Sequence, residues 1–189
     1  MNILLLDNYD SFSYNLVNIL RKFRKHRLSI LQPHEVNPEE LGVFDKMIFS
    51  PGPDIPARGD LMWQIIHRYH REKSILGICL GFHAISIYFG VQLRNVGTVV
   101  HGQTRQVSLT DPSEPLFRGI VSPFRVGLYH SWTPKTSTFP AELKPTAVSS
   151  EGLVMAHAHH IWDLRGVQFH PESVMTPEGQ RMIENWLSI

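Results

Sequence analysis

The sequence predicts an α/β protein with one central, mostly parallel sheet flanked by helices. Short, continuously apolar runs such as Asn2–Leu6 and 75–78 are typical of strands covered on both faces. Segments with apolar residues at helical spacing follow several of these runs. Repeated strand and helix units of this kind favour parallel strands joined by right-handed crossovers.

The first half of the chain alternates between the two kinds of element. The strand at Asn2–Leu6 ends abruptly at Asp7, and helical spacing then predicts a helix over 13–23, with Asp10 and Ser11 as candidate caps. The later elements expected in this half are strands at 28–31, 47–49 and 75–78, a Pro-Gly-Pro turn at 51–53, and helices at about 59–69 and 80–89.

After Gly90 the pattern changes to short apolar runs separated by proline and glycine. These runs predict strands without long intervening helices, at 104–109, 124–129, 147–149, 154–157 and 166–169. Helical spacing returns at 177–187. Because no internal repeat, low-complexity segment or interdomain linker is visible, we expect one domain over residues 1–189.

Composition narrows the class of protein. The 189 residues are 42% hydrophobic and 19% charged, so the chain can bury one sizeable core. A net charge of +1 gives no broad positive field, which argues against a nucleic acid partner, and the basic segment at 21–27 is expected to be a solvated helix end. The single cysteine, Cys79, excludes an intramolecular disulfide and favours a cytoplasmic location. The apolar start at 1–6 is too short for a signal peptide or membrane span, so no membrane association is expected.

Cys79 lies between an apolar strand and a helix, in the segment SILGICLGFHAISIYF at 74–89. A residue on so sharp a strand-to-helix turn adopts strained backbone geometry, and side chains at Gly77 and Gly81 would collide with neighbouring backbone. The positive end of the helix dipole that starts at Leu80 favours a thiolate. Cys79 is therefore a candidate nucleophile, although a lone cysteine beside a buried strand is also compatible with an inert core residue.

A candidate base lies near the C-terminus, in the segment GVQFHPES at 166–173. His170 stands at the end of an apolar strand, and Pro171 turns the chain toward Glu172. Glu172 can accept a hydrogen bond from one ring nitrogen, which leaves the other nitrogen to face a nucleophile. Because active residues of open parallel sheets gather beyond the carboxyl ends of strands, we expect His170 to meet Cys79 there.

Six segments together resemble the class I, triad-type glutamine amidotransferases, and within them the small subunits of anthranilate synthase and aminodeoxychorismate synthase. The resemblance covers essentially the whole chain and implies a flavodoxin-like α/β fold. The segments are LLLDNYDSFSYNL at 4–16, SPGP at 50–53, GICLG at 77–81, HG at 101–102, YHS at 129–131 and VQFHPES at 167–173.

The resemblance also implies a reaction. Cys79 attacks the side-chain carboxamide of L-glutamine, His170 protonates the leaving ammonia, and water hydrolyses the resulting glutamyl thioester. Backbone N–H groups of Gly52 and Leu80 are the implied oxyanion donors. Contact with glutamine is expected from Gly52, Pro53, His83, Ser131 and Trp132.

Several positions depart from the family pattern. The family has His and Gln after the second glycine of the cysteine segment, where this chain has Phe82 and His83. Either His83 supplies a different donor to glutamine or the substrate binds more weakly; we favour the first, because an imidazole N–H can replace an amide donor. The other departures are Asp54 after SPGP, Gln103 after His-Gly, and Trp132 where leucine is commoner.

The polar segment DNYDSF at 7–12 follows the first strand. Its simplest role is to cap the next helix, and the resemblance implies that it also faces the synthase subunit. The expected partner interface comprises Asn8, Tyr9, Asp10, Ser11, His101 and Gly102.

The eleven histidines do not indicate a metal site. His157 and His159 are expected on one strand face with His160 opposite, and no cysteine or nearby carboxylate completes a ligand set. Glycine-rich phosphate loops are absent from the sequence, so no cofactor is expected.

The sequence thus predicts a glutaminase subunit that supplies ammonia to a larger chorismate-using synthase, component I, as its heterodimer partner. The partner is implied because 189 residues leave no room for a chorismate-binding domain. Para-aminobenzoate synthesis for folate and anthranilate synthesis for tryptophan both remain open. Two alternatives also remain: a subunit serving another acceptor, such as a guanylate synthetase, and a catalytically silent regulatory subunit.

Overall fold

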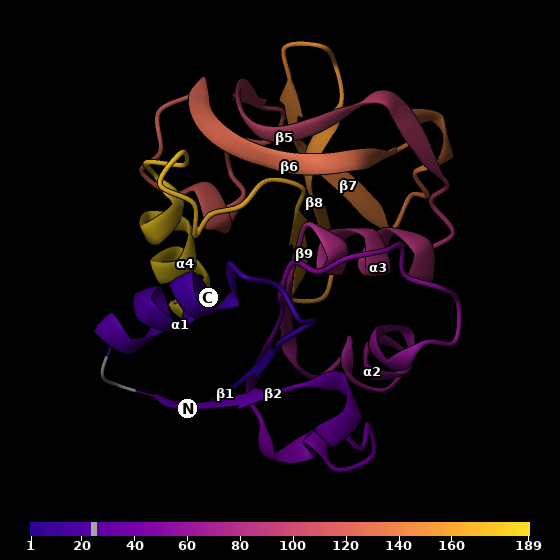
Figure 1. Ribbon diagram of the computed structural model, residues 1–189, viewed down its shortest axis with the longest axis vertical. Coiled ribbons are helices and arrows are strands. Elements are labelled where there is room, and N and C mark those ends of the chain that lie inside the picture. Colours follow the sequence, from indigo (N-terminus) through magenta and orange to yellow (C-terminus); the bar gives the residue numbers. More distant parts are fainter. Residues whose placement is uncertain (24–25) are drawn as a thin grey trace.

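A computed structural model describes residues 1–23 and 26–189 of the chain. Within these residues one nine-stranded sheet has the strand order β2-β1-β3-β4-β9-β8-β7-β5-β6, and four α-helices pack against it (Figure 1). The predicted α/β fold with a central sheet is confirmed.

One half of the sheet is parallel and carries all four α-helices. Its strands are β1 (Asn2–Leu6), β2 (Arg27–Leu31), β3 (Lys46–Phe49), β4 (Ser74–Ile78) and β9 (Leu164–Val167). The helices are α1 (Ser13–Lys22), α2 (Leu61–Tyr69), α3 (Leu80–Tyr88) and α4 (Gly179–Leu187). Their bounds lie within two residues of those expected from apolar spacing.

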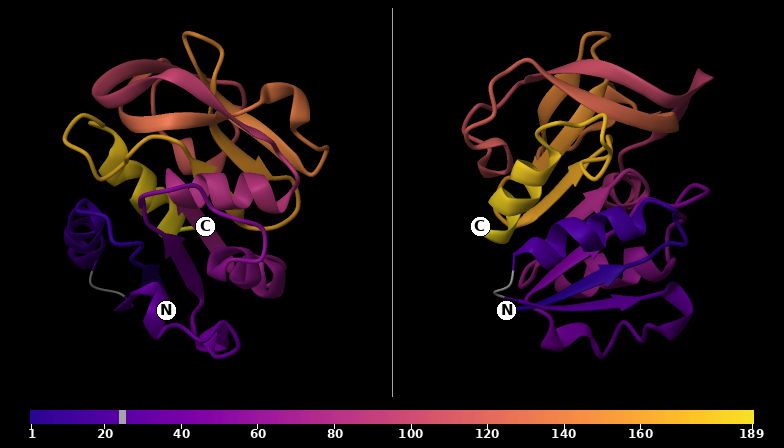
Figure 2. Two further views of the ribbon diagram at one scale, coloured as in Figure 1. Left: turned by 45° about the vertical axis from the view of Figure 1, so that its right-hand side comes forward. Right: turned by 60° about the vertical axis from the view of Figure 1, so that its left-hand side comes forward.

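The two faces of the parallel half bury separate cores. In β1, Ile3 and Leu5 pack on the side of α1 and α4, whereas Leu4 and Leu6 pack on the side of α2 and α3. The two helix pairs are seen from different directions in Figure 2. Because successive side chains of a strand point to opposite faces, a strand covered on both sides must be apolar throughout, as β1 is.

The other half of the sheet is antiparallel. It consists of β5 (Leu93–Leu109), β6 (Phe124–Pro134), β7 (Leu143–Ser149) and β8 (Val154–His159). The β5–β6 hairpin is longer than expected, because β5 begins eleven residues earlier than the apolar run at 104–109. Its pairing with β6 has register shifts between Asn95 and Val100 and between His101 and Gln103, and such irregular pairing interrupts the alternation by which a strand is recognised.

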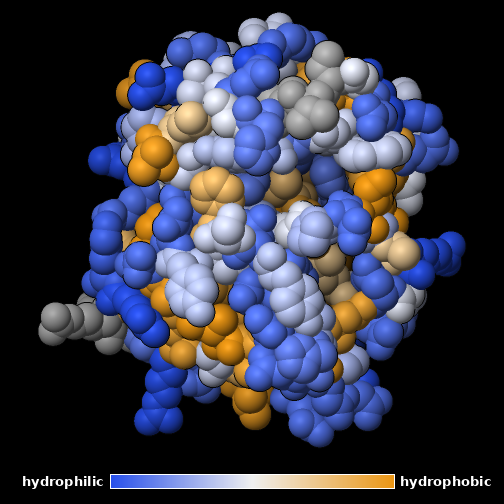
Figure 3. Space-filling model, in the orientation of Figure 1, coloured by the Kyte–Doolittle hydropathy of each residue, from blue (hydrophilic) through white to orange (hydrophobic). Residues whose placement is uncertain are grey.

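Polar residues cover much of the surface seen in Figure 3, with apolar residues between them. No helix within the described residues has the length and apolar character needed to cross a bilayer. Arg21 and Lys22 of the basic segment lie exposed in the last turn of α1, as expected of a solvated helix end, whereas Arg27 of the same segment begins β2. Arg24 and Lys25 of the same segment lie outside the described residues.

Candidate active site

Cys79 and His170 follow neighbouring strands of the parallel half. Cys79 comes directly after β4 and His170 three residues after β9, and Ile78 is paired with Val167 across these strands. The backbone N–H of Cys79 donates to the carbonyl of Val167 over 2.8 Å. The sheet therefore brings two segments about ninety positions apart in sequence to one edge.

The turn at Cys79 has the strained backbone geometry predicted from the strand-to-helix sequence around it. Its φ angle is 51°, in a region that residues other than glycine rarely adopt. A β-carbon at Gly77 would lie 2.4 Å from the carbonyl carbon and oxygen of Gly81, and one at Gly81 would lie 2.6 Å from Cβ of Phe49. The two glycines therefore let α3 begin directly against β3 and β4.

Cys79 borders a cavity of about 470 Å³, although the residue is only 7% exposed. Cys79 thus belongs to the edge of the apolar core and faces the cavity. The cavity brings together the residues expected to bind glutamine and the two expected oxyanion donors. Its lining comprises Gly52, Pro53, Asp54, Ile55, Cys79, Leu80, His83, Tyr129, His130, Ser131 and Trp132.

Gly52 reaches this cavity because the chain packs closely behind it. A β-carbon there would lie 2.7 Å from Cβ of Asn8 and 2.7 Å from a methyl group of Leu80. Only a glycine fits between these groups, so its backbone can approach a molecule in the cavity without a side chain in the way.

His170 is held by Glu172 in a buried ion pair. The imidazole donates from Nδ1 to Oε1 of Glu172 over 2.6 Å, and the two residues are 2% and 5% exposed. Burial by itself lowers the pKa of His170, but interactions with Cys79 and Glu172 outweigh it and raise the pKa to about 10. The other ring nitrogen, Nε2, is buried and makes no hydrogen bond to the described residues, which leaves it free to exchange a proton in a reaction.

Two aromatic rings pack against the His170 imidazole. Phe12 meets it edge-on with 5.3 Å between ring centroids, and Tyr129 does so with 4.8 Å. Contacts of this kind fix the orientation of a ring. Neither residue was among the predicted site residues, although both lie in segments that carry the family resemblance, DNYDSF and YHS.

His83 lines the cavity as expected, but one of its nitrogens is already engaged. Its Nε2 is hydrogen-bonded to Oε1 of Gln168 over 2.8 Å, and burial lowers its pKa to about 4. Gln168 in turn places its amide nitrogen 3.8 Å from the sulfur of Cys79. Sequence reasoning missed Gln168 too, although it stands two residues before His170 in VQFHPES.

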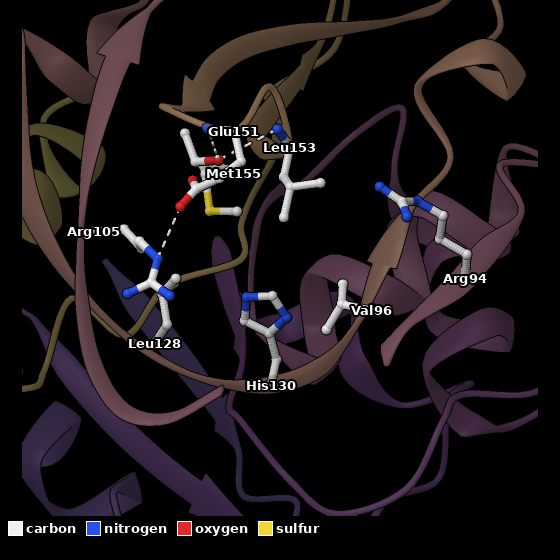
Figure 4. Close-up of a pocket in the computed structure, with 9 residues that line it drawn as sticks. Arg94, Val96, Arg105, Leu128, His130, Glu151, Leu153 and Met155 are labelled. Carbon is white, nitrogen blue, oxygen red and sulfur yellow. Dashed lines mark hydrogen bonds and ion pairs between the residues drawn. The ribbon is translucent and has the colours of Figure 1, made fainter. Parts of the chain in front are cut away.

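His130 lines both this cavity and a second one of about 300 Å³, which is drawn in Figure 4. Burial, followed by the influence of His83, lowers the pKa of His130 to about 4, so its ring is uncharged near neutral pH. In the second cavity Nε of Arg105 pairs with a carboxylate oxygen of Glu151 over 3.0 Å. The rest of its lining comprises Arg94, Val96, Leu128, Ser149, Leu153 and Met155.

The expected partner interface is largely exposed, with one correction. Tyr9, Ser11, His101 and Gly102 are exposed and Asp10 is half-buried. The side chain of Asn8, however, is buried: its amide donates to the carbonyl of Ser50 over 3.0 Å, and its backbone N–H donates to the Ser50 hydroxyl over 2.9 Å. Asn8 therefore braces the turn before Gly52 and does not offer its side chain to a partner.

Neither Asp10 nor Ser11 caps α1 as expected: the N-cap residue is Phe12, and no side chain makes a cap hydrogen bond there. Asp10 instead accepts a hydrogen bond from the backbone N–H of Phe12 over 2.7 Å, and the Ser13 hydroxyl donates to Asp7 over 2.5 Å. Both carboxylates lie near the positive end of α1.

The histidine-rich strand is packed against α3. His157 stacks on Phe82 of α3 with 4.4 Å between ring centroids, and His159 lies 5.3 Å from Phe89, the residue that follows α3. These two histidines therefore share a strand face as expected. His160 was expected on the opposite face, but it lies just beyond β8 and stacks on His159 with 4.9 Å between ring centroids. Among the described residues, no group of three histidine, cysteine or acidic side chains is placed to hold a metal ion.

Comparison with known proteins agrees with this geometry. The family described as glutamine amidotransferase class-I matches residues 4–189. Anthranilate synthase component 2 of Mycobacterium tuberculosis is 37% identical over 192 residues, which span 100% of this chain and 82% of that protein. Aminodeoxychorismate synthase component 2 of Escherichia coli is 35% identical over 193 residues, which span 98% of each protein.

Solved structures share the fold. A Thermoplasma acidophilum protein aligns with a TM-score of 0.85 at 24% identity, covering 100% of this chain and 92% of that one. A glutamine amidotransferase of Thermotoga maritima aligns with a TM-score of 0.76 at 16% identity, covering 100% and 81%. The family match over nearly the whole length, together with these full-length relatives, identifies the chain as a member of the class-I glutamine amidotransferase family.

Proposed function

We propose that this chain hydrolyses L-glutamine to glutamate and ammonia through a thioester on Cys79, and that it supplies the ammonia to a chorismate-using synthase subunit. The observation that carries the proposal is the meeting of three features at one sheet edge. Cys79 borders a cavity, His170 interacts with Cys79, and Glu172 holds His170 in place.

The raised pKa of His170 determines that the imidazole is protonated at the start of the reaction. Near neutral pH the imidazole carries a positive charge, which favours a thiolate on Cys79. The thiolate attacks the carboxamide carbon of glutamine, and the negative charge moves to the carbonyl oxygen. Backbone N–H groups of Gly52 and Leu80 are the proposed donors to this oxygen, each contributing about 3 kcal/mol if well placed.

His170 then acts as acid and base in turn. It gives its proton to the leaving nitrogen as the C–N bond breaks, which releases ammonia and leaves the thioester. The neutral imidazole next takes a proton from water, whose oxygen attacks the thioester carbon. Glutamate leaves, and the thiolate and imidazolium are restored.

Glutamine is proposed to lie in the cavity against Pro53, His83, Ser131 and Trp132. Nε2 of His83 is bonded to Gln168, and the ring also interacts with the backbone of Trp132. Burial keeps the ring uncharged near neutral pH. These contacts hold the ring at the wall of the cavity, where we propose that it contacts glutamine as an uncharged group.

Relatives named as components of anthranilate synthase and aminodeoxychorismate synthase support a chorismate-using acceptor. The exposed Tyr9, Ser11, His101 and Gly102 are the proposed docking surface. Ammonia freed into water at neutral pH is mostly ammonium, which is unreactive as a nucleophile. A docked acceptor avoids that loss.

The decisive experiment compares the purified chain and its Cys79→Ala variant, each mixed with candidate component I subunits and chorismate. We expect the native chain to support product formation from glutamine and the variant to support it from ammonia alone. Identifying the product as anthranilate or aminodeoxychorismate assigns the acceptor. Absence of glutamate release with and without every partner contradicts the proposal and favours a silent regulatory subunit.

A further inference from the structure

Gln168 is buried between two residues of the cavity. It is 0% exposed, its Oε1 is 2.8 Å from Nε2 of His83, and its Nε2 is 3.8 Å from the sulfur of Cys79. Its backbone N–H donates to the carbonyl of Met155 over 2.8 Å, which anchors it to β8. A single amide thus connects the imidazole on α3 with the thiol at the start of the same helix.

We propose that Gln168 is a positioning residue for Cys79, and that His83 fixes the orientation of its amide so that the N–H donor, not the carbonyl oxygen, faces the sulfur. The inference deepens the proposed glutaminase function and rests on it for its biological meaning. The contacts themselves are independent of any substrate.

The chemistry of the two contacts supports this orientation. An amide has one acceptor end and one donor end, so a donor on one neighbour determines which end faces the other. Burial keeps His83 uncharged near neutral pH, and an uncharged imidazole with its proton on Nε2 is the donor that the Gln168 oxygen needs. The amide nitrogen is then left for the sulfur, where an N–H favours the thiolate over the thiol.

The need for such a contact follows from the backbone. Cys79 stands on a strained turn with no side-chain hydrogen bond from the cap position of α3. Two side chains, those of His170 and Gln168, interact with its sulfur. His170 supplies charge and a proton, whereas Gln168 supplies an uncharged donor that cannot change its protonation state.

The test measures alkylation of the single thiol by iodoacetamide as a function of pH, followed by intact mass. In this reaction the thiolate displaces iodide and forms a thioether, so neither glutamine nor a partner is needed. For Gln168→Met we expect alkylation at neutral pH to slow about tenfold and the midpoint of the pH profile to rise by about one unit, the effect of losing one charge-assisted hydrogen bond. Gln168→Glu keeps an acceptor for His83 but sets a carboxylate against the thiolate, so its midpoint should rise further.

Ser86→Ala is the matched control. Ser86 is buried on α3 and donates to the carbonyl of Phe82 over 2.9 Å, yet it does not border the thiol cavity. Its pH profile should equal that of the native chain. A general loosening of α3 would change the control as well, whereas loss of the Gln168 donor changes only the two Gln168 variants.

The coupling to His83 is tested by a double-mutant cycle. If His83 acts on the thiol through the amide, His83→Ala slows alkylation in the native chain and has a smaller effect in the Gln168→Met background. Equal effects in both backgrounds overturn the coupling. Unchanged profiles in folded Gln168→Met and Gln168→Glu overturn the positioning role, and if Gln168→Met does not fold, Gln168→Glu and His83→Ala still decide it. Failure of the native chain to hydrolyse glutamine bears only on the proposed function, because alkylation is independent of it.

Discussion

Nδ1 of His170 donates a buried hydrogen bond to Oε1 of Glu172, two residues further along the chain, with 2.6 Å between the two atoms. Pro171 between them turns the backbone so that the carboxylate folds back onto the ring. This contact fixes which nitrogen of the imidazole remains for the thiol, and it supports a positive charge that burial alone would not allow.

Replacing Glu172 with Gln should therefore slow the reaction without disturbing the cavity. The amide keeps the size of the carboxylate but not its charge. Of the two groups that raise the pKa of His170, Cys79 and Glu172, the second is then lost, so the pKa falls and less of the imidazole is protonated. We expect glutamate release to fall by roughly 10² to 10⁴-fold, the usual contribution of acid and base catalysis. Steady-state assays with the partner subunit measure this. Full activity in the variant would contradict the role assigned to the pair.

The same ion pair predicts how stability depends on pH. Folding raises the pKa of His170 from 6.5 to about 10, so the folded chain holds a proton that the unfolded chain releases within that window. The stabilisation is complete below pH 6.5 and is lost as pH rises toward about 10. Urea denaturation at closely spaced pH values should show a steeper loss of unfolding free energy for the native chain than for Glu172→Gln. Parallel curves would show that Glu172 does not raise this pKa.

Gly77→Ala should be among the most destabilising single substitutions in the chain. Its new methyl group would lie 2.4 Å from the backbone of Gly81, and neither strand nor helix can move away. We expect a loss of about 3 kcal/mol or more in unfolding free energy. Gly42→Ala is the control, because a β-carbon there meets nothing within 4 Å. Similar urea midpoints for the two variants would disprove the close packing of α3 on β4.

Asn8 and Tyr9 are adjacent, yet their substitutions should act differently. Asn8→Ala removes the side-chain bond to Ser50 and should cost about 1–3 kcal/mol of stability, since it leaves a buried carbonyl unsatisfied. Tyr9 is 56% exposed, so Tyr9→Ala should leave stability nearly unchanged and weaken partner binding. Thermal denaturation and titration calorimetry with component I separate the two effects. If Asn8→Ala were fully stable but bound the partner more weakly, Asn8 would belong to the interface after all, and the structural role assigned to it would be wrong.

Much of the fold followed from local patterns. Continuous apolar runs identified β1, β3 and β4 because strands covered on both faces need no polar side, and Gly77 and Gly81 marked the turn at Cys79 through their lack of side chains. The full length of the β5–β6 hairpin was not predicted, because its irregular pairing and glycines remove the alternation that defines a strand. The boundaries of regular elements were therefore predictable, and those of the bulged hairpin were not.

The sequence by itself determined the family, the strained turn that carries Cys79, and the order of a thiol, an imidazole and a carboxylate along the chain. Tertiary structure alone decided which side chains became neighbours: Gln168 with His83 and Cys79, and Asn8 with Ser50. The physical reason is that local spacing governs backbone conformation, whereas burial, pKa and hydrogen-bond partners depend on groups that only the packed sheet brings together.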